Sequence, residues 1–207
     1  MKHRLAAFFC LLLAVGAMPA SAQLLYEEGK HYFELENPQP TDGDGPEVIE
    51  FFSYGCPHCY EFEPALNEWL ESKPEAVSFY RLPTGLGRDI FERMSAAYYI
   101  AEELGVAEQI HTPLFEEIHE KRNRRIVSLE GLAEFLARFG VSRQDFLDAL
   151  NSDRVQQRFA AGESKAPAYE IMGVPTLVVN GRYRVTRGEH VTSFDQMLDI
   201  VDFLLDQ

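Results

Sequence analysis

The pattern of apolar and polar positions predicts a strand, a helix and a second strand in the first part of the chain. Residues 48–52 form an apolar run of strand length that is interrupted by the acid Glu50. A helix is expected to begin at Cys56 or Pro57, because proline is favoured in the first turn of a helix. Apolar and polar positions alternate in residues 76–83, which predicts a second strand.

A long helical block follows. Between residues 89 and 169, apolar side chains recur at helical spacing, and Gly105 is expected to end the first helix. Ser128 and Ser142 each precede an apolar-periodic segment and are predicted to cap a helix. A further helix is expected to start after Ser152 and Asp153.

Strands return near the end of the chain. Residues 174–179 and 182–185 are strand-like and flank Asn180-Gly181, the dipeptide that most strongly predicts a hairpin turn. Ser193 is then predicted to cap a last amphipathic helix. The predicted order is strand, helix, strand, a helical block of about 80 residues, hairpin and helix.

Residues 1–22 have the layout of a secretory signal peptide. A basic start precedes the apolar run Leu5 to Val15, and Ala20-Ser21-Ala22 supplies small residues for cleavage. The apolar run is shorter than the roughly 20 residues that a membrane-spanning helix needs. We therefore expect an exported protein that is cleaved after Ala22 and loses Cys10 with the signal.

The charge balance narrows the possible partners. The chain has 19 basic and 33 acidic residues and a formal net charge of −14, which becomes about −16 once Lys2 and Arg4 leave with the signal. This excess argues against nucleic acid or an anionic membrane as partner. The basic run at residues 121–125 is expected to end a helix, where cations suit the helix dipole.

Two cysteines remain after cleavage, Cys56 and Cys59, and three chemistries fit a Cys-X-X-Cys locally. A structural bridge would close almost no loop in a chain that is large enough to fold without one. Structural zinc needs four ligands, and the other histidines of the mature chain are scattered. His111 and His119 lie eight residues apart on a predicted helix, where we expect partly exposed surface positions.

Redox chemistry is the favoured interpretation of the pair. A cysteine at the start of a helix faces unpaired amides and the positive end of the helix dipole, which stabilise a thiolate. Cys56 is therefore expected to be the nucleophile, and Cys59 can resolve a mixed disulfide. Pro57 stiffens the turn, and His58 adds a donor or a positive charge beside the sulfur.

Three segments together resemble the DsbA family of periplasmic thiol:disulfide oxidoreductases in the thioredoxin superfamily. They are Glu50-Phe51-Phe52-Ser53-Tyr54-Gly55-Cys56-Pro57-His58-Cys59-Tyr60, Gly173-Val174-Pro175-Thr176 and the Asn180-Gly181 turn. The resemblance covers nearly all of the mature chain. It implies an α/β, thioredoxin-like fold with an inserted helical domain. The domains are then predicted as residues 23–87 with 170–207 for the thioredoxin-like part and 88–169 for the insert.

The resemblance also implies roles for several residues. Pro175 corresponds to a cis-proline beside the active site, and the backbone of Val174 is expected to lie against a bound substrate strand. Glu50 corresponds to a buried acid under the sulfurs. Arg81 takes the place of the lysine that partners this acid in some relatives. The alternative interpretation, that Arg81 is an ordinary residue on the surface of the strand, is equally compatible with the sequence.

The expected function is that of an exported dithiol oxidase. It would pass a Cys56–Cys59 disulfide to reduced exported polypeptides, in the periplasm, as a monomer and with no other cofactor and no metal. The resemblance implies a membrane quinone-linked oxidase of the DsbB type as electron acceptor. The alternatives are an isomerase or reductase, which usually needs a dimerisation domain or another dipeptide between the cysteines, and a binding or chaperone module.

The relative stability of the two redox forms follows from two magnitudes. A disulfide across four residues is expected to stabilise the fold by about 2 kcal/mol on the chain-entropy model. If the pKa of Cys56 in the folded chain lies near 4, the reduced form gains roughly 4 kcal/mol at pH 7. On this condition the sequence predicts that the reduced protein is the more stable form.

Overall fold

The structure, a computed structural model, describes residues 25–207. The predicted signal peptide, its cleavage after Ala22 and Cys10 lie outside the described residues. Within residues 25–207, no helix combines the length and the apolar character that crossing a membrane requires.

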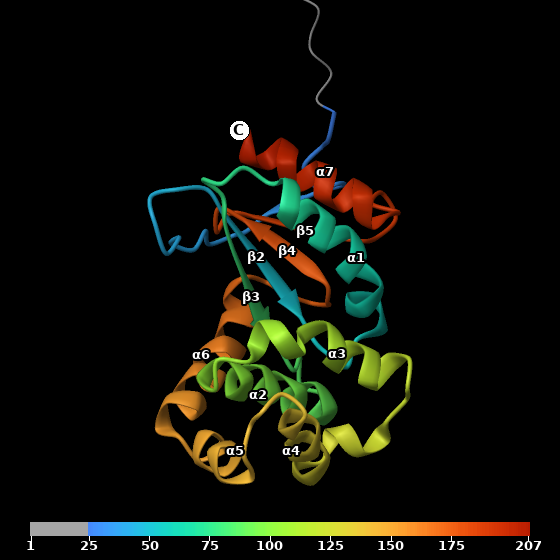
Figure 1. The fold of residues 1–207 in the computed structure, drawn as a ribbon. Coiled ribbons are helices and arrows are strands. Elements are labelled where there is room, and N and C mark those ends of the chain that lie inside the picture. The colour runs from blue at the N-terminus through green and yellow to red at the C-terminus, as the bar shows by residue number, and fades with distance from the viewer. Residues whose placement is uncertain (1–24) are drawn as a thin grey trace, which may run out of the picture.

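A five-stranded sheet in the order β1-β5-β4-β2-β3 forms the framework of the upper half of the molecule (Figure 1). Strand β2 pairs parallel with β3 and antiparallel with β4, so it lies inside the sheet and joins distant segments of the chain. Strands β4 and β5 form the predicted antiparallel hairpin. The strands are β1 (Phe33–Glu34), β2 (Glu47–Phe52), β3 (Ser78–Pro83), β4 (Thr176–Val179) and β5 (Tyr183–Thr186).

Two helices, α1 (Pro57–Ser72) and α7 (Phe194–Leu205), pack against one face of the sheet (Figure 1). Val48 of β2 shares an apolar cluster with Phe62 and Leu66 of α1. Because side chains alternate along a strand, Glu50 points to the same face as Val48, toward α1. The opposite face, with Ile49, is covered by the end of α6 and the residues that follow it.

The remaining helices form the lower half of the molecule (Figure 1) and pack around an apolar cluster of their own. This cluster includes the side chains of Cys56 and Cys59, so the two cysteines lie where the helical block meets the sheet domain. The helices are α2 (Asp89–Glu103), α3 (Ala107–His119), α4 (Leu129–Ala137), α5 (Arg143–Leu150) and α6 (Asp153–Ala168). This is the α/β architecture with a helical insertion that the sequence predicts.

Local sequence chemistry accounts for several boundaries. The hydroxyls of Ser128 and Ser142 accept hydrogen bonds from the amides of Gly131 and Asp145, which confirms both predicted caps. Asn180 and Gly181 have φ angles of +52° and +59°, as the two central positions of the tight turn between Val179 and Arg182 require. The exact domain boundaries proposed from the sequence stay a prediction.

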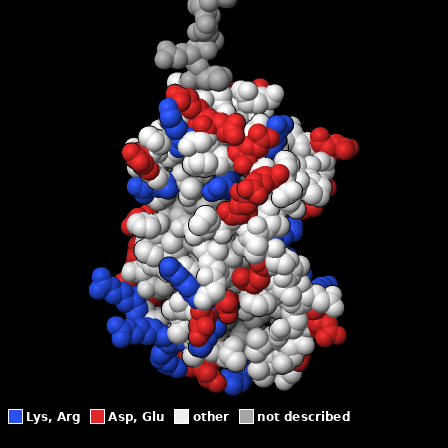
Figure 2. Space-filling view, turned by 180° about the vertical axis from the view of Figure 1, so that it is seen from behind, with Lys and Arg blue, Asp and Glu red and all other residues white. Residues whose placement is uncertain are grey.

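The basic run at residues 121–125 differs from the prediction. Helix α3 ends at His119, before the run, and residues 124–127 form a short 3-10 helix that the sequence did not predict. The side chain of Asn123 accepts from the amide of Arg125 and starts this 3-10 turn. Seen from behind, Lys and Arg side chains gather at the lower left edge of the molecule, in the part formed by the helical insertion (Figure 2).

Candidate active site

Cys56 occupies the position immediately before helix α1. Its backbone is extended (φ −93°, ψ 117°), and Pro57 is the first helical residue, as predicted. The pKa of Cys56 is lowered from 9.0 to about 6. The largest cause is a hydrogen bond from the Cys59 thiol, and the backbone amides of Cys59 and His58 and the charge of His58 add to it, against the opposing effect of burial.

Cys59 lies one turn further into α1 and has no exposed surface. Burial raises its pKa well above 9.0, and the hydrogen bond to Cys56 and the charges of Cys56 and Glu50 raise it further. Both cysteines are free thiols. One sulfur is thus prepared to be a thiolate at neutral pH, while its neighbour holds its proton.

The loop before β4 meets the active-site helix. The peptide bond between Val174 and Pro175 is cis, and the Cys56 thiol donates to the carbonyl oxygen of Val174 at 3.4 Å. Two segments separated by 118 positions in the sequence therefore meet at the reactive sulfur. The carbonyl of Val174 gives the site a backbone acceptor beside Cys56.

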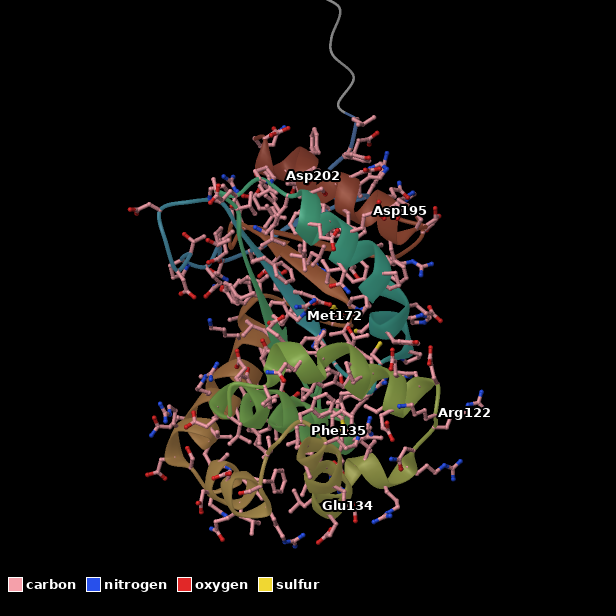
Figure 3. All side chains as sticks on the ribbon, in the orientation of Figure 1. Arg122, Glu134, Phe135, Met172, Asp195 and Asp202 are labelled. Atoms are coloured by element: carbon pink, nitrogen blue, oxygen red, sulfur yellow. The ribbon has the colours of Figure 1, made fainter. Side chains whose placement is uncertain are left out.

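A hollow of about 420 Å³ opens beside the cysteine. His58, on its rim, is exposed, and its Nδ1 lies 3.0 Å from Oε2 of Glu61. Met172, on the segment between α6 and β4 (Figure 3), leaves 89% of its surface exposed. The hollow is lined by His58, Gly173, Val174, Thr186, Arg187 and Gly188.

Glu50 lies completely buried beneath the active-site helix, as predicted. Arg81, its register partner on β3, places Nε 3.0 Å from Oε2 of Glu50, and only 10% of the Arg81 side chain is exposed. The alternative that placed Arg81 on the strand surface is therefore wrong. Burial raises the pKa of Glu50 from 4.5 to about 8, although Arg81 opposes this shift.

Two further buried residues, Glu63 and His111, belong to this site, although the sequence indicated no role for either of them. Glu63 of α1 lies 3.2 Å from Nε2 of His111, and its other oxygen lies 3.7 Å from the Arg81 guanidinium. His111 is buried, so the expectation of a partly exposed position is wrong. The spacing of Glu63 from Cys59, one helical turn, was the only sequence signal that could have placed it on the buried face of α1.

Helix α3 also fixes the tyrosines that flank the motif. Tyr54 is fully buried, its hydroxyl lies 2.8 Å from Nδ1 of His111, and its carbonyl oxygen lies 2.8 Å from Nε2 of His119. Tyr60 stacks on His119 with ring centroids 5.3 Å apart, and its hydroxyl donates to Glu120. Packing against the helical insertion is therefore the observed role of Tyr54.

Residues 25–207 contain no group of three or more His, Cys, Asp or Glu side chains arranged to hold a metal ion. The arrangement of Cys56 and Cys59 suits sulfur chemistry. A stabilised thiolate can attack or leave a disulfide, and a buried second thiol within one turn can close or open a mixed disulfide.

Comparisons with known proteins agree with this chemistry. The model of the DSBA-like thioredoxin domain matches residues 78–199. The thiol:disulfide interchange protein DsbA of Pseudomonas aeruginosa is 38% identical over 183 residues, which cover 88% of this chain and 85% of that protein. The DsbA of Burkholderia cepacia is 36% identical over 202 residues, covering 95% and 94% of the two chains.

Solved structures give the same result for the fold. The crystal structure of Pseudomonas aeruginosa DsbA matches with a TM-score of 0.80 at 38% identity, over 87% of this chain and 93% of that one. The crystal structure of DsbA from Xylella fastidiosa also has a TM-score of 0.80, at 36% identity, over 86% and 95%. These matches confirm the thioredoxin-like fold with its helical insertion.

Proposed function

We propose, on the premise that this chain belongs to the DsbA family of thioredoxin-like proteins and is a thiol:disulfide oxidoreductase, that Cys56 is its nucleophile and Cys59 its resolving thiol. The observation that supports these roles most directly is the contrast between the two sulfurs. The pKa of Cys56 is lowered to about 6 at the start of α1, whereas the pKa of the buried Cys59 is raised. In this proposal the disulfide between them is the protein's redox group, with no further cofactor.

Oxidation of a substrate then runs in two exchanges. A substrate thiolate attacks the Cys56 sulfur of the Cys56–Cys59 disulfide, a mixed disulfide forms, and Cys59 leaves with the electron pair and takes up a proton. The second substrate thiolate attacks the substrate sulfur of the mixed disulfide, and Cys56 leaves as a thiolate. Two electrons pass from two substrate thiols to the cysteine pair, and the polypeptide leaves with a disulfide.

Glu50 is the proposed source of the proton for Cys59. Its pKa of about 8 means that it is mainly protonated at pH 7, while the Cys59 thiol holds its proton more strongly still. Transfer from Glu50 to a newly released Cys59 thiolate is therefore favourable. Pro57 and His58 tune the Cys56 thiolate, and Val174 with Pro175 borders the strand of the bound substrate.

Members of this family are periplasmic and act on reduced polypeptides. For this chain we propose that residues 1–22 direct export and are removed after Ala22. The electron acceptor proposed for the reduced pair is a membrane quinone-linked oxidase of the DsbB type, and the protein is proposed to act as a monomer. Amino-terminal sequencing of the exported protein tests the cleavage position.

A trapping experiment tests the roles of the cysteines. In the Cys59→Ala variant, Cys56 is first joined to a small thiol in a mixed disulfide. A peptide with one reduced cysteine should then attack Cys56, displace the small thiol and remain bound to Cys56 as a stable mixed disulfide. The matched Cys56→Ala variant should form no comparable adduct at the same pH. Faster capture through Cys59 than through Cys56 would overturn the assignment.

A further inference from the structure

Behind the two cysteines lies a buried quartet of ionisable side chains, Glu50, Glu63, Arg81 and His111. Each comes from a different element, namely β2, α1, β3 and α3. The Arg81 guanidinium lies between the acids, with Nε 3.0 Å from Glu50 and a terminal nitrogen 3.7 Å from Glu63. His111 contacts Glu63 from the other side, at 3.2 Å.

The charges of the quartet do not balance if both acids are ionised. One guanidinium can compensate one carboxylate, and each of the four side chains is at least nine-tenths buried. A second uncompensated negative charge in such a site is costly, so one of the two carboxyl groups keeps its proton at neutral pH. The neighbours of each acid decide which of the two it is.

His111 makes two contacts that together favour one protonation pattern. When the ring is neutral and protonated at Nε2, the Tyr54 hydroxyl donates to Nδ1 at 2.8 Å, and the protonated Nε2 lies 3.2 Å from the Glu63 carboxylate and favours its ionised form. Burial lowers the pKa of His111, which keeps the ring neutral, and the charged groups that face it are Glu63 from α1, Arg81 from β3 and Glu108 from α3 itself.

We propose that His111 is a positioning residue of the redox centre, because its contact with Glu63 holds that carboxyl in the ionised form and so leaves the exchangeable proton on Glu50 beneath Cys59. The helical insertion thereby determines which acid serves the chemistry of the sheet domain. This inference rests on the proposed function for its consequence, the supply of a proton to Cys59.

The pKa directions of the two acids agree with the geometry. Burial acts to raise the pKa of Glu63, but the hydrogen bond from His111, with charges nearby, outweighs it and lowers that pKa below 4.5. For Glu50, burial is the largest influence, Arg81 opposes it, and the charge of Glu63 adds to it, so that the pKa reaches about 8. Two buried acids that share one arginine are thus driven in opposite directions.

The titration of Glu50 tests the proposal directly. Reduced protein labelled with 13C at the side-chain carboxyl of glutamate is titrated by NMR, and the Glu50 resonance is identified by its loss in Glu50→Gln. In His111→Leu, Glu63 loses the contact with His111 and takes up the proton that Glu50 carries in the wild type. Arg81 then compensates the negative charge of Glu50 alone. The midpoint of Glu50 should therefore fall by about one pH unit or more.

The chain offers a matched control on the same helix. His119 contacts the carbonyl of Tyr54 but belongs to none of the three ion pairs of the quartet, so His119→Leu should leave the Glu50 midpoint unchanged. His111→Gln, whose amide can both donate and accept, should restore most of the wild-type midpoint. An unchanged midpoint in folded His111→Leu, or an equal fall in His119→Leu, overturns the proposal.

A second variant keeps the test decisive if His111→Leu does not fold. Glu63→Gln removes the competing charge but keeps the shape, so it should lower the Glu50 midpoint by itself, and an unchanged midpoint would overturn the proposal. In that background His111→Gln should have no further effect on Glu50. The titration needs no substrate, so a protein without oxidase activity but with the predicted midpoints would refute the proposed function while leaving this coupling intact.

Discussion

Glu50 and Arg81 are register partners on the parallel strands β2 and β3, and Nε of Arg81 lies 3.0 Å from Oε2 of Glu50. The backbone ladder itself therefore brings the two charges together, without help from a flexible loop. The Arg81 side chain is 10% exposed and that of Glu50 is not exposed at all. In such a buried pair, the removal of one partner leaves the other without compensation.

Replacement of Arg81 should destabilise the protein strongly. We expect Arg81→Met to lower the free energy of unfolding by about 3–5 kcal/mol, because Glu50 and Glu63 lose the cation that they share. Urea denaturation at pH 7 measures the change. The matched control is Arg182→Met, which removes an exposed pair with Glu34 and should cost far less, because water screens an exposed ion pair. Similar losses in the two variants would contradict a structural role for the buried pair.

Replacement of Glu50 should have an effect on stability that depends on pH. The pKa of Glu50 rises from 4.5 to about 8 on folding, so its favourable contribution is complete below pH 4.5 and is lost as the pH rises toward 8. The free energy of unfolding of Glu50→Gln, relative to that of the wild type, should therefore increase with pH. The increase should be small at pH 4 and should reach about 3 kcal/mol at pH 7. Denaturation curves at both pH values measure this difference, with Glu68→Gln as an exposed control. A pH-independent difference would show that folding does not shift the pKa of Glu50.

Local signals made most of the fold predictable from the sequence. Ser128 and Ser142 satisfy helix amides within three residues, and Asn180-Gly181 adopts the positive φ angles that this dipeptide favours in a turn. The position of Cys56 before a helix also followed from its neighbour Pro57. The meeting of Cys56 with Val174 did not, because contacts across 118 positions leave no local pattern, and only the resemblance to a family indicated it.

The missed residues share a physical reason. Glu63 and His111 are polar side chains on amphipathic helices, where the default is a position facing water. Glu63 lies beside Arg81 and His111, and His111 lies between Glu63 and the Tyr54 hydroxyl, so these partners offset the cost of desolvation. Such a group can be recognised only after α1, α3 and β3 are packed together, so periodicity along one element cannot reveal it.

The two thiols should differ greatly in reactivity toward alkylating agents. In reduced protein the rate of Cys56 alkylation should rise with pH to a midpoint near 6, because the thiolate is the reacting form. Cys59, buried and with a raised pKa, should react at least about 100-fold more slowly at pH 7. Peptide mapping by mass spectrometry after brief labelling measures both rates. Cys56→Ser should abolish oxidation of a dithiol peptide, and equal labelling of the two wild-type thiols would remove the assignment of the nucleophile.

The stability of the reduced form relative to the oxidised form should increase with pH. The disulfide closes a short loop and is expected to contribute about 2 kcal/mol to the oxidised form at any pH. The pKa of Cys56 falls from 9.0 to about 6 on folding, so the thiolate stabilises the reduced fold fully above pH 9 and not at all well below pH 6.

With a pKa of about 6, this gain is about 1 kcal/mol at pH 7 and about 3 kcal/mol at pH 8.5, less than the roughly 4 kcal/mol that a pKa near 4 would give at pH 7. The two contributions therefore balance between pH 7 and pH 8.5. Thermal melts of both forms at pH 5, 7 and 8.5 should show the oxidised form melting higher at pH 5 and the reduced form melting higher at pH 8.5. The Cys56→Ser variant cannot form this thiolate. The difference between its melting temperature and that of the oxidised wild type should therefore not increase with pH. If the wild-type difference stays constant across this range, the Cys56 thiolate does not set the redox preference of the protein. If the reduced form already melts clearly higher at pH 7, the pKa of Cys56 lies closer to 4, and the protein is a stronger oxidant than a pKa of about 6 implies.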